Sequence, residues 1–160
     1  MLIRLTLDQA VATLRDGGVV LFPTETTYAL GCLARDPDAV RRVVGIKARP
    51  EGRPLPVMLP DWQSFLRLPL ESPLVPLAER FWPGPLTVVV PAFPGLPQAI
   101  TADTNMVGLR LSGHPVAQAL LKAVGEPLVA TSANRTGEPA AASLAACDAA
   151  GLGAVDGVLP

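Results

Sequence analysis

Three basic residues follow one another closely at Lys47, Arg49 and Arg53. A lysine ammonium is a compact point charge and an arginine guanidinium is a planar fork of donors, so together they suit a polyphosphate. Each charge-assisted hydrogen bond of this kind contributes about 1.5 to 3 kcal/mol. A Lys/Arg pair at the end of a helix can equally complement the helix dipole and stay in water. The spacing therefore indicates an anion site without requiring one.

Ser132 and Asn134 are a second pair of candidates. They follow the apolar segment 128–130, which we expect to be a short buried strand. A hydroxyl, an amide and free backbone N–H groups after a strand can bind an anion, although the same residues also form ordinary turns. The residues alone thus predict an anion site built from Lys47, Arg49 and the Ser132 loop.

The stretch 22–31 changes from apolar to polar at Pro23 and back to apolar after Tyr28. This pattern predicts a buried strand, a polar loop and a return of the chain into the core. Ligands of open α/β sheets usually bind at such loops on the carboxyl ends of strands. Glu25 is the only carboxylate of the loop, which is too little for a protein-built metal site. We therefore expect any Mg²⁺ to arrive on the phosphates of a ligand.

Composition narrows the class of protein. The 160 residues fit one domain, and 13 basic against 14 acidic residues leave a net charge of −1, so a nucleic-acid surface would be a local patch. One histidine and two distant cysteines predict no metal site and a reduced, cytoplasmic protein. We expect no membrane segment. Neither common glycine-rich phosphate cradle is present in the sequence.

Helix and strand signals alternate along the chain. Helix starts are expected where a capping residue precedes a proline or an apolar periodic segment, at Thr6, Asp36, Asp61, Ser72, His114 and Ser143. Apolar segments predict strands near 19–22, 55–59, 86–90, 107–111, 128–130 and 155–159. This order predicts an α/β (α+β) fold with a mixed sheet.

Five motifs, in order, resemble those of the YrdC family. They are Pro-Thr-Glu-Thr at 23–26, Lys-Ala-Arg-Pro at 47–50, Trp-Pro-Gly-Pro-Leu-Thr at 82–87, Val-Gly-Leu-Arg at 107–110 with His-Pro soon after, and Ser-Ala-Asn-Arg-Thr-Gly at 132–137. The resemblance implies one YrdC-like domain over 1–160, a twisted mixed sheet flanked by helices. Relatives usually continue past the last expected strand, so we expect the domain to lack a carboxyl-terminal segment.

Members of the family are threonylcarbamoyl-AMP synthases, and the resemblance implies that activity here. L-threonine and bicarbonate form a carbamate, whose oxygen attacks the α-phosphorus of ATP and releases pyrophosphate, with Mg²⁺ carried by the phosphates. The product passes to a threonylcarbamoyl-transferase complex that modifies tRNA. Binding of tRNA or double-stranded RNA is a further expectation of the resemblance.

The resemblance also assigns residues. The family's catalytic tetrad, which also contacts ATP, falls on Lys47, Arg49, Ser132 and Asn134. Arg53 matches an ATP-binding position. Thr26 and Arg110 match positions that hold threonine, with Arg110 expected to bind its carboxylate.

Three other functions remain open. The main alternative is a non-catalytic RNA-binding or ribosome-associated factor of the same fold. A second is a carbamoyl-adenylate site like that of the hydrogenase-maturation relatives, whose additional regions do not fit in this chain. A remote third is a serine hydrolase built on Ser132 and His114, for which the chain lacks a nucleophile-elbow motif.

Overall fold

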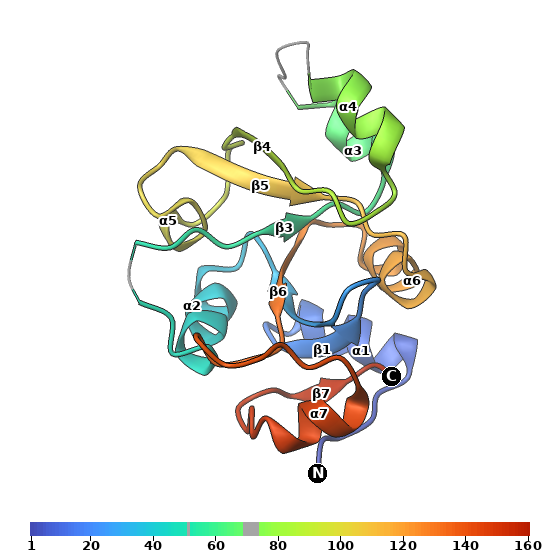
Figure 1. Cartoon of the computed structure of the whole chain (residues 1–160), viewed down its shortest axis with the longest axis vertical. Helices are drawn as coiled ribbons and strands as arrows, with labels where there is room; N and C mark the ends of the chain where they lie inside the picture. Colours follow the sequence, from blue (N-terminus) through green and yellow to red (C-terminus); the bar gives the residue numbers. More distant parts are fainter. Residues whose placement is uncertain (51, 69–73) are drawn as a thin grey trace.

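The structure, a computed structural model, describes residues 1–50, 52–68 and 74–160. These residues form a mixed sheet in the order β4-β5-β3-β6-β2-β1-β7 (Figure 1). The β1–β7 and β3–β5 pairs are parallel, and the other neighbouring pairs are antiparallel. The strands are β1 (Val20–Pro23), β2 (Tyr28–Leu33), β3 (Val57–Met58), β4 (Val88–Pro91), β5 (Met106–Arg110), β6 (Leu128–Ser132) and β7 (Gly157–Val158).

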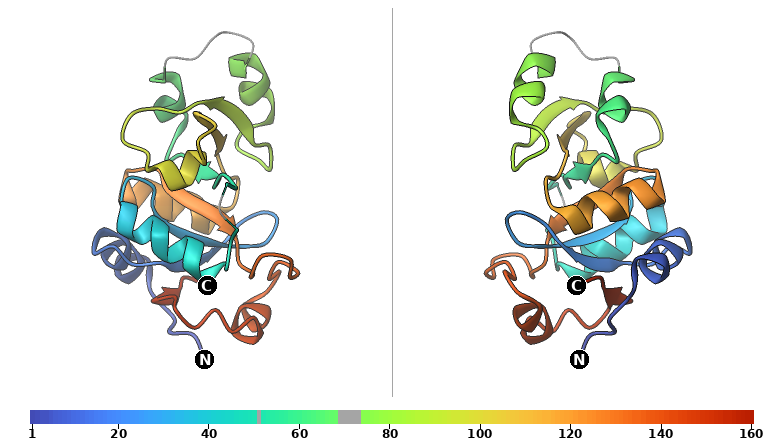
Figure 2. Two further views of the ribbon diagram at one scale, coloured as in Figure 1. Left: turned by 90° about the vertical axis from the view of Figure 1, so that its left-hand side faces the viewer. Right: turned by 90° about the vertical axis from the view of Figure 1, so that its right-hand side faces the viewer.

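Helices pack on both faces of this sheet, as the two side views in Figure 2 show. They are α1 (Leu7–Arg15), α2 (Pro37–Ile46), α3 (Trp62–Leu66), α4 (Leu74–Phe81), α5 (Gln98–Thr101), α6 (Pro115–Val124) and α7 (Leu144–Ala149). One face carries α1 and α6, which share a core with β1, β2 and β6. The opposite face carries α2, which packs on β2 and on α5. The predicted α/β fold with a mixed sheet is confirmed.

Local capping explains where the helices begin. Thr6 and Gln9 form a reciprocal capping box at the start of α1. The Asp36 carboxylate accepts hydrogen bonds from the second and third amides of α2, and His114 Nδ1 accepts one from Val116 N at 3.2 Å in α6. Ser143 caps α7 in the same way. Asp61 caps α3 by accepting a hydrogen bond from the Ser64 amide at 2.7 Å. These side chains satisfy amides that a helix cannot satisfy itself, so the expected helix starts at Thr6, Asp36, Asp61, His114 and Ser143 are confirmed. The expected start at Ser72 lies outside the described residues.

The sequence pattern was less accurate for short elements. The expected strands at 55–59 and 155–159 shrink to the two-residue strands β3 and β7. The return of the chain after the polar loop is a full strand, β2, and the four-residue helix α5 was not expected. A helix of one turn contains too few residues to show an apolar period. Among the described residues, no helix is both long and apolar enough to cross a bilayer.

Successive side chains of a strand point to opposite faces of the sheet, so a separate apolar core forms on each face. Leu21 and Leu30 face α2, whereas Val20 and Phe22 face α1 and α6. On β5, Val107 and Leu109 are buried while Gly108 and Arg110 are half-buried. On the neighbouring β4, Val89 is 56% exposed. The part of the sheet around Arg110 is therefore packed on one face and open on the other.

Gly31 in β2 tests how tightly this strand packs against its neighbour β1. A Cβ at this position would lie 2.4 Å from Cε1 of the fully buried Phe22 and 3.2 Å from the carbonyl oxygen of Val129. Gly31→Ala is expected to lower the free energy of unfolding by about 1 to 3 kcal/mol, because the closed core cannot accept the extra methyl. Urea denaturation measures the change.

Gly45→Ala in α2 is the matched control. A Cβ there would meet no heavy atom within 4 Å, so the same substitution should raise the free energy of unfolding, by up to about 1 kcal/mol. A Gly31→Ala protein as stable as the wild type would contradict the packing described for β1 and β2.

Candidate functional site

Lys47 stands at the carboxyl end of α2 and points into the protein. Its side chain is almost completely buried, with 2% of the residue exposed. The ammonium donates hydrogen bonds to the carbonyl oxygen of Ser132 at 2.7 Å, to Asn134 Oδ1 at 2.8 Å and to the Asn134 carbonyl oxygen at 3.1 Å. Three of the four residues of the expected tetrad are therefore in direct contact.

The loop after β6 is built around this ammonium. Ser132 Oγ donates to Asn134 Oδ1 at 2.7 Å, and Asn134 Nδ2 donates to the Glu138 carbonyl oxygen at 2.5 Å. The Thr136 amide donates to the Lys47 carbonyl oxygen at 2.8 Å. The loop is thus attached to the end of α2 through both the side chain and the backbone of Lys47.

Lys47 carries an ammonium group in a buried environment, which disfavours its charged form. Burial, and secondarily the nearby charge of Arg49, lower the pKa of Lys47 from 10.5 to about 8. In the part of the chain that the structure describes, no carboxylate forms an ion pair with this ammonium. Its hydrogen-bond partners in the described parts of the chain are neutral oxygens, and an anion nearby would stabilise a buried cation of this kind.

A cavity of about 160 Å³ lies beside Ser132 and is called the Thr26 pocket here. The β1–β2 loop forms one wall and Arg110, at the end of β5, forms another. The lining residues are Thr24, Thr26, Thr27, Tyr28, Ala29, Pro56, Val57, Met58, Thr87, Arg110, Ala130 and Ser132. The two expected threonine-binding residues, Thr26 and Arg110, are therefore in one cavity with Ser132.

Thr24 organises the loop that forms the pocket wall. Its hydroxyl donates to the Thr27 carbonyl oxygen at 2.6 Å and accepts from the amides of Thr26 and Thr27, each at 3.3 Å. The Thr26 hydroxyl lies 3.1 Å from the same oxygen. These hydrogen bonds fix the loop through its own side chains, as expected for a threonine-rich turn.

Glu25, in the same loop, forms an ion pair with Arg110, its Oε1 lying 3.0 Å from Nη2. The sequence considered alone predicted only that Glu25, as a single carboxylate, is too little for a metal site, and it predicted no role of Glu25 toward Arg110. A carboxylate inside the Pro-Thr-Glu-Thr motif was the one signal available, because its partner lies 85 residues further along the chain.

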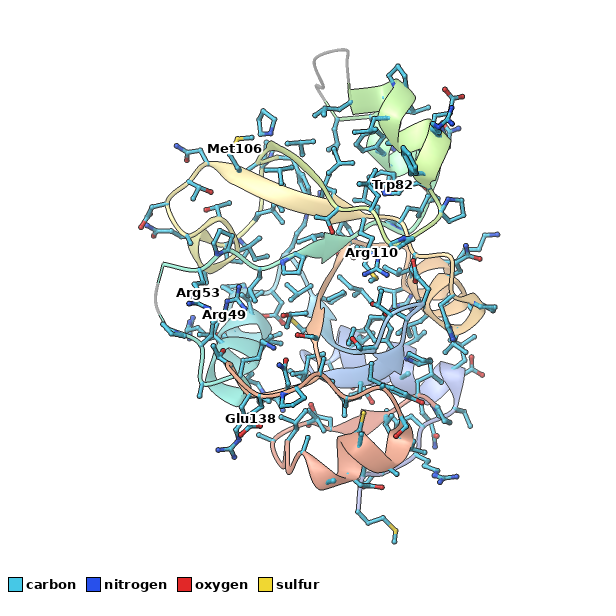
Figure 3. All side chains as sticks on the ribbon, in the orientation of Figure 1. Arg49, Arg53, Trp82, Met106, Arg110 and Glu138 are labelled. Carbon is cyan, nitrogen blue, oxygen red and sulfur yellow. The ribbon has the colours of Figure 1, made fainter. Side chains whose placement is uncertain are left out.

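Arg49 and Arg53 lie apart from these residues, on the side of α2 and α5 (Figure 3). The Arg49 guanidinium donates to the carbonyl oxygens of Pro54 at 2.6 Å and Arg53 at 3.2 Å. Burial and the charge of Arg53 lower the pKa of Arg49. Both arginines line a separate hollow of about 440 Å³. The three neighbouring cations of the sequence thus face two different regions.

The geometry does not support a serine hydrolase. Ser132 Oγ bonds to Asn134 and lies 3.5 Å from the Lys47 ammonium. Nδ1 of His114 accepts a hydrogen bond from the Val116 amide at the start of α6. No hydrogen bond between Ser132 and His114 occurs among the described residues.

Two solved structures share the fold of this chain. Sua5 of P. abyssi complexed with L-threonine superposes with a TM-score of 0.90 at 34% identity, covering 98% of this chain and 48% of that one. E. coli YciO superposes with a TM-score of 0.85 at 28% identity, covering 96% of this chain and 76% of that one. This chain thus spans about half the length of Sua5.

Sequence comparison places the chain in one family. The profile of the Sua5/YciO/YrdC family, described as telomere recombination, matches residues 12–160. A protein named threonylcarbamoyl-AMP synthase from Xanthomonas campestris pv. campestris is 46% identical, covering 96% of this chain and 84% of that protein. A synthase from Xanthomonas oryzae pv. oryzae is 43% identical, covering 97% and 85%. The chain belongs to the Sua5/YciO/YrdC family.

The lowered pKa of Lys47 predicts a specific pH dependence of stability. Below about pH 8 the residue is protonated in both the folded and the unfolded state. Between about pH 8 and 10.5 the folded state has lost the proton that the unfolded state keeps, so the free energy of unfolding must rise with pH. The wild type should therefore gain stability relative to Lys47→Met across this window.

Urea denaturation of both proteins at matched pH values measures this difference. Taking the difference cancels the titration of cysteine and tyrosine, which both proteins share. A constant difference between pH 7 and 10.5 would show that the ammonium has an ordinary pKa.

Proposed function

We propose that this protein is a threonylcarbamoyl-AMP synthase. In this reaction the amino group of L-threonine and bicarbonate form a carbamate with loss of water. A carbamate oxygen then bonds to the α-phosphorus of ATP, and the bond from that phosphorus to the pyrophosphate group breaks. The product is threonylcarbamoyl-AMP. Family membership and the curated synthases at 46% and 43% identity support this function.

One structural observation carries the proposal. A buried ammonium that lacks a carboxylate partner among the described residues lies next to a pocket that contains a second cation, Arg110. Two cations on either side of Ser132 suit a reaction that joins a carboxylate-bearing amino acid to a phosphate. Catalysis of this kind depends mainly on positioning and electrostatic stabilisation.

We assign the roles of the residues on this basis. Lys47 stabilises negative charge on the phosphates at the reacting phosphorus, and Ser132 and Asn134 orient the nucleotide and hold Lys47. Arg110 binds the carboxylate of L-threonine, and Thr26 contacts the same substrate. L-threonine is bound in the Sua5 structure from P. abyssi, which supports a threonine site in this fold.

Arg49 and Arg53 complete the ATP site in the proposal. Arg49 would exchange its neutral carbonyl partners at 53 and 54 for phosphate oxygens, because charge-assisted hydrogen bonds are the stronger ones. Mg²⁺ would accompany ATP on its phosphates. Downstream, a transferase would consume threonylcarbamoyl-AMP to modify tRNA.

The non-catalytic RNA-binding alternative has less support. The curated relatives that cover most of this chain are named as synthases. Lys47 is also buried and hydrogen-bonded to Ser132 and Asn134. An RNA-binding surface does not need a buried cation, because exposed cations usually make the contacts with RNA phosphates.

Pyrophosphate release tests the proposal. The chain should release pyrophosphate from ATP only when both L-threonine and bicarbonate are present. Lys47→Ala should lower kcat/KM by about 100-fold or more, because it removes a preorganised positive charge. The control is Lys122→Ala, which removes an exposed lysine in the last turn of α6. Release without threonine, or none by the wild type, would refute the proposed reaction.

Arg49→Ala tests the assignment of the ATP side. We expect the KM for ATP to rise about tenfold or more, with the affinity for L-threonine unchanged, because Arg49 lies outside the Thr26 pocket. Arg80→Ala, which removes an exposed arginine in the last turn of α4, is the control and should leave both values unchanged. An altered threonine affinity in Arg49→Ala would contradict the separation of the two regions.

A further inference from the structure

Glu25 ties the β1–β2 loop to the chain segment that follows β5. Its carboxylate accepts hydrogen bonds from Ser112 Oγ at 2.5 Å and from the Gly113 amide at 3.2 Å. The ion pair with Arg110 is a third contact of the same carboxylate. Ser112 is fully buried, and the Glu25 and Arg110 side chains are 22% and 15% exposed. The position of this carboxylate is therefore fixed by its surroundings.

Arg110 still has donors to offer. Its Nε is buried and has no hydrogen-bond partner among the described residues. Its Nη2 meets Glu25 at 3.0 Å in an ion pair without the alignment of a hydrogen bond. Buried donors of this kind favour a ligand that can accept from them, and the guanidinium fork matches a carboxylate. Arg110, labelled in Figure 3, is one of the residues that line the Thr26 pocket, where such a ligand would bind.

Building on the proposed function, we propose that Glu25 is a positioning residue for L-threonine, which holds the Arg110 guanidinium in the orientation that binds the substrate carboxylate. Without Glu25, the long arginine side chain would have several rotamers available at the open face of β5. Binding would then have to fix the guanidinium as well as the substrate. The cost of ordering would appear as a weaker affinity for threonine.

The same contacts argue against Glu25 as a general base for the amino group of threonine. Partial burial raises the pKa of Glu25, but hydrogen bonds from Ser112, the loop backbone and Gly113, together with the ion pair to Arg110, outweigh it and lower the pKa to about 2. So weak a base, with its oxygens already occupied, is a poor proton acceptor near neutral pH. Glu25 therefore acts through Arg110.

Glu25→Gln tests this role, because glutamine keeps the size of the side chain and removes its charge. The KM for L-threonine should rise about 10- to 100-fold, the loss expected when a charge-assisted contact is removed. The KM for ATP should stay unchanged, and kcat should change little. Glu79→Gln, which neutralises an exposed carboxylate on α4, is the matched control and should behave like the wild type.

The ratio of two ligand affinities separates positioning from a general loss of structure. We would measure binding of L-threonine and of L-threoninamide, which lacks the carboxylate, by calorimetry. Wild type should strongly prefer L-threonine, and Glu25→Gln should lose most of that preference. If both ligands weaken equally, or the ratio stays as in wild type, Glu25 does not act through the substrate carboxylate and the inference is overturned.

Two further observations keep the outcomes distinct. Wild-type protein that neither binds L-threonine nor releases pyrophosphate would refute the proposed function, and the inference with it. An active wild type with an unchanged ratio in the variant would refute the inference alone. If Glu25→Gln fails to fold, Ser112→Ala removes one donor to the same carboxylate. It should shift the ratio in the same direction by a smaller factor, and an unchanged ratio would overturn the inference.

Discussion

The buried ammonium of Lys47 is the interaction on which the candidate site depends. It joins the end of α2 to the end of β6, which lie 85 residues apart in the sequence. A buried cation needs an oxygen partner for each of its N–H groups, and here the last residue of β6 and the loop after it supply three. The shape of that loop is thus set by a side chain from another element, and the Asp36 cap that starts α2 helps to place it.

Strand order explains why the two halves of the site meet. β2 and β6 are antiparallel neighbours, and their register places Ala29 opposite Ser132. The beginning of β2, and with it the Thr26 loop, therefore lies beside the end of β6. β3 lies between β5 and β6, and its register places Arg110 beside Met58, level with Leu128 at the beginning of β6. The Arg110 side chain nevertheless lines the same pocket as Thr26 and Ser132, so arginine, threonine and serine from distant segments meet there.

The arginines near Lys47 show how a short loop can divide a cluster of charges. Lys47 ends α2 and points inward, whereas Arg49 turns outward and bonds to carbonyl oxygens of its own loop. Mutual repulsion favours this separation, since a second buried guanidinium beside an uncompensated ammonium would be costly. A polyphosphate would change that balance because it compensates both charges together.

The sequence by itself determined the local features of this protein. Capping residues such as Thr6 and Asp36 act on amides within their own helices, so their effect is readable without the fold, and ordered motifs identified the family. Only the tertiary structure decided which residues touch. That Lys47 faces Ser132 while Arg49 turns away, and that Glu25 holds Arg110, follows from strand order and register, which bring together residues far apart in the chain. Such contacts depend on packing over the whole domain, and a pattern of neighbouring residues does not contain that information.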